Sequence, residues 1–171
     1  MENSFFINAL KQAHWVVSNS ATHQNFDIST FADGRLAHVP FDVKEFIHSF
    51  AVCANPADTV WFLSAMDYSD ESENAFPWNE FEQQSMMAAS DTLMADIAAF
   101  WSSHLPILFS VKNGYQYVAV GIAAHNKGKF FYGREPEYED VVAIATSFTE
   151  FKEKYIEALN GNPPAYYDFI S

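Results

Sequence analysis

The chain has 171 residues, the usual size of one domain, and its 49% hydrophobic and 17% aromatic content is too apolar for a disordered protein. It carries 22 acidic and 9 basic residues, a net charge of −13, so we expect it to bind neither nucleic-acid backbones nor anionic membrane surfaces. The single cysteine, Cys53, excludes an internal disulfide and a cysteine zinc site, and the acidic N-terminus lacks the pattern of an export signal, so we expect a cytoplasmic protein.

Residues 1–39 are predicted to form an N-terminal helix followed by a hairpin-like extension. Apolar residues from Phe5 to Ala13 recur at helical spacing, and Trp15-Val16-Val17 follows as a short apolar stretch. Asp33-Gly34 is a turn signal between two short segments, which suggests the hairpin.

A second helix is expected to begin at Pro40-Phe41-Asp42, with Asp42 and Glu45 at the spacing of a capping box, and to end at Asn55-Pro56. The β-rich residues 59–66 predict a buried strand. The polar residues that follow, as far as residue 74, predict a loop.

The next predicted helix begins at Ser90 or Asp91, which would cap it, and ends at Pro106. Its large apolar residues recur at a spacing that places them on one face, so we expect this face to pack on the core. These residues are Leu93, Met94, Ile97, Phe100 and Trp101.

The last third of the chain predicts an antiparallel meander and a final helix. Ser147 and Glu150 are a capping box that begins the helix, and Asn160-Gly161 ends it. The tail at residues 161–171 is expected to lie on the surface. We therefore predict an α+β fold, a single domain with a mostly antiparallel sheet packed against helices and a core at residues 40–160. The strands of the meander are expected at residues 107–111, 115–123, 129–133 and 141–146, with an Asn113-Gly114 turn between the first two.

Motifs of catalysis are mostly absent, so we expect a protein that is not an enzyme and binds no cofactor or metal. The six histidines have no metal-like spacing, and Cys53 lies in an apolar stretch where packing explains it better than nucleophilic chemistry. The carboxylates between residues 67 and 73 could hold calcium, but they lack the glycine and the alternation of an EF-hand loop. They could also be a glycosidase-like pair, although nothing in the sequence separates their pKa values.

The charge distribution points to a docking surface. Between Glu45 and Val111 the sequence has ten acidic residues and no Lys or Arg, whereas acids that serve only solubility would be interspersed with bases. Aromatic residues ringed by charge suit a surface that captures a cationic protein. The alternative is a solvated loop with a core tryptophan, and the acidic run Glu135, Glu137, Glu139 and Asp140 has the same two interpretations. The candidate partner-binding residues are Asp67, Asp70, Glu71, Glu73, Phe76, Trp78, Glu80 and Glu82.

Three stretches resemble the SUKH superfamily, which includes yeast cell-wall-synthesis regulators, Syd-like proteins and many bacterial toxin-immunity proteins. The stretch from Pro40 to Phe46 is similar to the Leu-Pro-x-Asp-Tyr-x-x-Phe helix of that family. Residues 115–120 with 128–132 resemble its central hairpin, and Ala145-Thr146-Ser147-Phe148-Thr149-Glu150-Phe151 resembles its Ala-x-Ser-Phe-x-x-Phe ending. The family's Asn-Gly-Gly after the first helix is replaced here by Asn55-Pro56.

The resemblance implies a bacterial, non-enzymatic binding protein with no shared catalytic residues. The expected function is that of an immunity protein, which neutralises a cognate toxin by direct protein–protein binding. An intracellular adaptor or scaffold of the same fold and an uncharacterised enzyme are the alternatives. Charge does not separate the first two, because proteins of both classes can be acidic.

Overall fold

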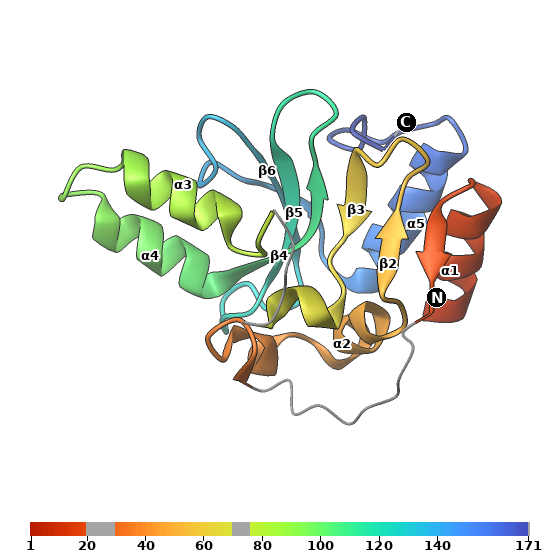
Figure 1. Cartoon of the computed structure of the whole chain (residues 1–171), viewed down its shortest axis with the longest axis horizontal. Coiled ribbons are helices and arrows are strands. Elements are labelled where there is room, and N and C mark those ends of the chain that lie inside the picture. The colour runs from red at the N-terminus through yellow and green to blue at the C-terminus, as the bar shows by residue number, and fades with distance from the viewer. Residues whose placement is uncertain (20–29, 70–75, 171) are drawn as a thin grey trace.

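The chain is organised around a seven-stranded antiparallel sheet in which each strand pairs with the next one along the sequence. The computed structural model describes residues 1–19, 30–69 and 76–170 (Figure 1). The strands are β1 (Val16–Ser18), β2 (Val52–Ala54), β3 (Val60–Phe62), β4 (His104–Ser110), β5 (Gln116–Gly121), β6 (Phe130–Arg134) and β7 (Val142–Ala145).

Helices pack on both faces of this sheet, so the fold is α+β as the sequence predicted. In Figure 1, α1 and α5 lie side by side at one side of the sheet, while α3 and α4 extend away from the opposite side. The described helices are α1 (Asn3–Gln12), α2 (Phe41–His48), α3 (Glu80–Ala88), α4 (Met94–Ser103) and α5 (Phe148–Leu159), with two short 3-10 helices, η2 (Arg35–His38) and η3 (Ala65–Tyr68).

The core on the first face is a cluster of aromatic side chains. Phe62 of β3 lies 5.1 Å from Phe46 of α2 and 5.3 Å from Tyr155 of α5, and Phe6 of α1 lies 5.4 Å from Tyr155 (ring centroids). These rings meet edge-on or tilted, the arrangements that aromatic quadrupoles favour. The cluster therefore joins three helices to one strand.

The second face is covered only over the middle of the sheet, within the part of the chain that the structure describes. Phe81 of α3 packs 4.9 Å from Phe109 of β4, and Trp101 of α4 lies 5.3 Å from Tyr117 of β5 (ring centroids). Over β1 and β2 this face is open, since Val16, which pairs with Ala54, is 57% exposed and Val52 is 49% exposed.

The N-terminal residues belong to the same core rather than to an extension. Phe6 and Leu10 of α1 are fully buried, and β1 pairs with β2. The Lys152 ammonium donates a hydrogen bond to Asn3 Oδ1 at 2.9 Å and lies 4.4 Å from the centre of the Phe148 ring. Burial lowers the pKa of Lys152. The side chain thus ties α5 to the start of α1.

Two predicted elements in the first half were wrong. Asp33-Gly34 leads into η2 rather than a hairpin, because Gly34 at φ 80° turns the chain directly into a 3-10 helix. The second helix ends at His48 and not at Asn55-Pro56, since the chain extends there to pair β2 with both β1 and β3. Asn55 instead accepts hydrogen bonds from the backbone N–H groups of Thr59 and Val60, at 2.8 Å and 3.1 Å, and so holds the β2–β3 turn.

The predicted caps were correct in part. No capping side chain is found at the start of α2, where Pro40 is the N-cap residue. Ser147 caps α5 as predicted, because its Oγ accepts the Glu150 N–H at 3.2 Å. The Glu150 carboxylate, however, accepts from the N–H of Thr146, at 2.8 Å, rather than from that of Ser147.

The second half of the chain follows the predicted order of strands and final helix, with two differences. Pro106 does not end α4 but lies inside β4, which begins at His104. The C-terminal tail does not lie on the surface, since Tyr167, Phe169 and Ile170 are buried. Phe169 stacks on Tyr132 of β6 at 5.7 Å between ring centroids, so the tail completes the core.

Among the helices that the structure describes, none has both the length and the apolar character needed to cross a membrane.

Candidate functional site

A groove opens on the second face of the sheet over β2 and β3. Side chains alternate between the two faces of a strand, so Cys53 points into the helical core while Val52 and Ala54 point to the open face. Trp61 of β3 is the cross-strand partner of Ala54 and therefore shares this face. The local sequence of β2 and β3 thus builds the floor.

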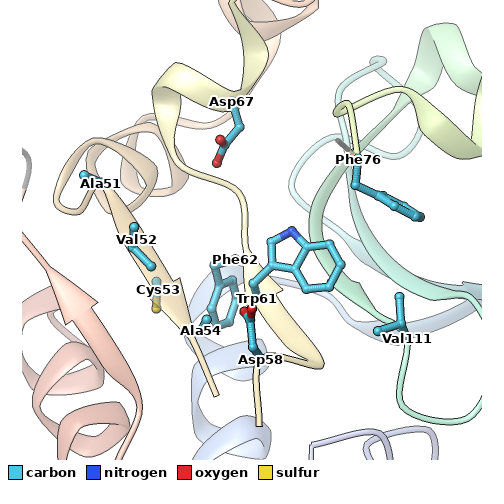
Figure 2. Close-up of a pocket in the computed structure, with 10 residues that line it drawn as sticks. All are labelled: Ala51, Val52, Cys53, Ala54, Asp58, Trp61, Phe62, Asp67, Phe76 and Val111. Carbon is cyan, nitrogen blue, oxygen red and sulfur yellow. The ribbon is translucent and has the colours of Figure 1, made fainter. Parts of the chain in front are cut away.

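The groove has a volume of about 390 Å³. Figure 2 shows Val52 on one side and Phe76 and Val111 on the other, with the Trp61 indole between them. The Val52 side chain is 49% exposed, and Trp61 and Phe76 are half-buried. Apolar surface of this kind is available to a ligand or a protein partner.

The aromatic wall of the groove is held firmly in place. Trp61 packs edge-on against Phe76 at 5.8 Å and against Phe109 at 5.9 Å, and Phe76 packs against Phe81 at 5.5 Å, all between ring centroids. Because α3 supplies Phe81, the position of the wall depends on the packing of that helix. A rigid wall reduces the entropy lost on binding.

Two carboxylates stand at opposite ends of the groove, as Figure 2 shows. Asp67 belongs to the capping box of η3, where its Oδ2 accepts the Ser64 N–H at 2.6 Å. Asp58 is exposed in the β2–β3 turn, with φ at 53°. No Lys or Arg is among the described residues that line the groove. The site thus combines an apolar floor with negative ends.

Cys53 lies beneath the groove and is only 1% exposed. Burial raises the pKa of its thiol to about 12, so the thiolate needed for nucleophilic chemistry is disfavoured at neutral pH. The residue lies in a strand, not at the helix end that the sequence indicated, and its side chain fills the core below the site.

Of the predicted docking residues, the structure brings Asp67 and Phe76 together in the groove. Asp70, Glu71 and Glu73 lie outside the described residues. Glu80 is half-buried on α3, where it accepts a hydrogen bond from Gln84 at 2.8 Å.

Trp78 and Glu82 lie away from the groove and beside Arg35, a contact that the sequence did not predict. Trp78 is 8% exposed and packs 6.3 Å from the Tyr68 ring, so it is the core tryptophan of the alternative interpretation and not an exposed anchor. The Arg35 guanidinium lies 5.2 Å from the centre of the Trp78 ring and binds both carboxylate oxygens of Glu82, at 2.6 Å and 2.9 Å. Glu82 is therefore neutralised by a residue 47 positions earlier.

The second acidic run forms a separate polar hollow of about 360 Å³ at the turn after β6. Glu135, Glu137 and Asp140 line it together with Arg134, so the hollow contains a base as well as acids. Glu139 is not among the lining residues, because its carboxylate accepts the Trp101 indole N–H at 2.7 Å. This mixed charge makes the hollow a weaker candidate for cation binding than the groove.

Sequence reasoning missed Val52, Trp61 and Asp58. The sequence predicts a helix that includes Val52 and Cys53, and a buried strand that includes Trp61. β2 has only three residues, of which Val52 is exposed while Cys53 and Ala54 are buried, and three residues are too few to separate period 2 from helical spacing.

Within residues 1–19, 30–69 and 76–170, no group of three or more His, Cys, Asp or Glu side chains is placed to hold a metal ion. The sequence matches no model of a known protein family, and no curated protein matches it.

Proposed function

We propose that this chain is a non-enzymatic binding protein that docks a cationic segment of a partner protein in the groove over β2 and β3. The observation that carries the proposal is the composition of the groove, in which an apolar floor with Val52 exposed lies between Asp58 and Asp67, and the described lining residues include no Lys or Arg. A partner that places an apolar side chain on Val52 and Trp61 and a Lys or Arg beside Asp58 would complement this surface.

Two physical effects support binding of this kind. Burial of an exposed apolar side chain contributes about 1.5–3 kcal/mol, which supplies affinity. The net charge of −13 creates a field that accelerates the encounter with a cationic partner, and the acids at the groove orient it. Trp61 suits the centre of such a site, since tryptophan is enriched among residues that dominate binding energy.

The partner that we propose is a bacterial toxin domain, which the chain neutralises by occupying its surface. This part of the proposal comes from the resemblance of residues 40–46, 115–132 and 145–151 to SUKH proteins. In the fold these stretches form α2, the β5–β6 hairpin and the β7–α5 junction.

The test uses the products of the reading frames beside the gene, each purified and titrated against this protein by calorimetry. We expect one basic product to bind, and its toxicity in growth assays to be suppressed by co-expression of this chain. Val52→Lys should weaken that binding about tenfold or more, because it places a like charge in the groove. Asp58→Asn should weaken it by a smaller factor and reduce its salt dependence, since asparagine tolerates the left-handed backbone of this turn.

Phe5→Lys is the matched control, because Phe5 is 59% exposed on α1 and does not line the groove. It should bind as the wild type does. If a neighbouring product binds and Val52→Lys leaves its affinity within about twofold, the groove is not the interface. If none of the neighbouring products binds, the toxin assignment is wrong.

A further inference from the structure

A second surface with exposed apolar side chains lies on the arm formed by α3, α4 and the turn between them, residues 80–103. Figure 1 shows the two helices side by side, extending away from the sheet. The arm is attached through Phe81 and Trp101, which are 1% exposed. A backbone hydrogen bond from the Leu93 N–H to Ser90 O, at 2.9 Å, closes the turn between the two helices.

Large apolar side chains are exposed at the outer end of this arm. Met87 is 79% exposed, Leu93 52% and Met94 38%. Met94 and Leu93 were predicted to pack on the core, so this half of the predicted stripe was wrong. Of the five residues of that stripe, only Trp101 is buried, while Ile97 and Phe100 are half-buried.

The solvent-facing side of α4 is also apolar. Ala95, Ala98 and Ala99 are exposed, and Ala95 and Ala99 lie on the side opposite Ile97 and Trp101. A helix that is apolar around most of its circumference is normally buried. The small alanine side chains would allow the backbone of another helix to approach closely, near the short end of the usual 8–10 Å between packed helices.

The charge on the arm indicates which kind of partner it would bind. Four acidic residues and no Lys or Arg lie between Asn79 and Ser103. Glu82 is paired with Arg35, but Asp91 and Asp96 are exposed beside the apolar surface. An acidic margin around exposed methionines favours a basic partner, and methionine adapts its shape to varied apolar surfaces.

We propose that the α3–α4 arm binds a basic amphipathic helix of a partner protein, at a site separate from the groove. The apolar side of that helix packs on Met87, Leu93 and Met94, and its Lys or Arg residues face Asp91 and Asp96. The ten residues of α4 span about 15 Å, which matches about three turns of a bound helix. This inference does not depend on the proposed function of the groove.

Self-association is a poorer fit to the same surface. A second copy would bring Asp91 and Asp96 of both chains together without a base to compensate them, at a net charge of −13 for each chain. Like charges placed opposite each other oppose association. The same absence of bases disfavours an anionic membrane.

The experiment uses a fluorescent Leu/Lys peptide of about 14 residues with helical periodicity as the probe, followed by fluorescence anisotropy. A peptide of the same composition but alternating Leu and Lys controls for charge alone. A Leu/Glu helix controls for apolar contact alone. We expect the Leu/Lys helix to bind most tightly, and its affinity to fall as salt rises from about 50 mM to about 300 mM.

The variant Met87→Ser with Leu93→Ser should lose about tenfold or more in affinity for the Leu/Lys helix. Asp91→Asn with Asp96→Asn should lose less and flatten the salt dependence. Phe5→Ser is the matched control, because it removes an exposed apolar side chain from α1, outside both the arm and the groove, and should bind the peptide as the wild type does. Hydrogen exchange of the wild-type complex should show protection within residues 86–99.

Three outcomes would overturn the inference. The first is equal binding by the wild type and the Met87→Ser, Leu93→Ser variant, with no protection in the arm. The second is a concentration-dependent dimer in sedimentation velocity that this variant abolishes, which would assign the surface to a second copy. The third is co-sedimentation of the wild type, but not of the variant, with phosphatidylcholine vesicles, which would assign it to a lipid surface.

Discussion

The ion pair between Arg35 and Glu82 should contribute measurably to stability, unlike most charge pairs at protein surfaces. Both partners are mostly buried, with side-chain exposures of 19% and 16%, and the guanidinium binds the carboxylate through two hydrogen bonds. Arg35 also donates to Trp101 O at 3.2 Å and lies over the Trp78 ring. The pair therefore fastens η2 to α3 and α4.

The magnitude follows from the geometry. A hydrogen bond to a charged group contributes about 1.5–3 kcal/mol net, and residual solvent screening lowers this, so we expect a coupling energy of about 1–2 kcal/mol. Arg35→Met retains the apolar stem over Trp78, and Glu82→Gln retains the shape of the acid. Each single variant should be less stable than the wild type, and the double variant less destabilised than the sum of the two.

Urea denaturation of the four proteins in this cycle measures the coupling. The more exposed pair of Lys154 and Glu150 on α5 is the control, with side-chain exposures of 33% and 35% and a distance of 2.7 Å. Its coupling should be about 0.3–0.5 kcal/mol, as for other helical pairs four residues apart. If the Arg35–Glu82 coupling is no larger than that of the control pair, burial and bidentate geometry do not stabilise this fold.

Two further variants test buried polar groups. The Tyr155 hydroxyl is buried without a hydrogen-bond partner among the described residues, whereas the Tyr68 hydroxyl donates to Pro106 O at 2.7 Å. In urea denaturation, Tyr155→Phe should therefore leave the free energy of unfolding unchanged or raise it. Tyr68→Phe should lower the free energy of unfolding by about 1 kcal/mol. Burial lowers the pKa of His104 from its ordinary value of 6.5. A hydrogen bond to Phe100 O raises this pKa and offsets part of the shift, and the nearby His125 lowers it further. The unfolded chain therefore binds the proton more readily, and the free energy of unfolding should fall as pH drops below 6.5 toward the folded pKa. His104→Gln should have a shallower fall between pH 7 and pH 5, and an equal slope would contradict this reasoning.

The sequence by itself determined the elements whose signals are local. Ser147 and Asn160-Gly161 mark the two ends of α5, and the hydrogen bond from Glu150 N–H to Ser147 forms within one turn. Asn113-Gly114 marks the β4–β5 turn, where Gly114 has φ at 87°. Such signals need no information about the rest of the chain, so the meander and the final helix could be predicted.

Elements that depend on distant partners could not be predicted in the same way. β2 has three residues, and it is a strand because β1 and β3 supply its hydrogen bonds from both sides. The buried tail has no periodicity to detect, and Phe169 is ordered by Tyr132 of β6. For both, long-range contacts outweigh weak local propensity.

The acidic composition of the middle third was evident from the sequence, but the positions of those acids in space were not. Only the tertiary structure brings Arg35 to Glu82, buries Trp78 and joins Asp67 to Phe76 in one groove. It alone leaves Met87 exposed on α3. The physical reason is that burial and pairing depend on which surfaces meet when the sheet and helices pack, and those contacts link residues far apart in the chain.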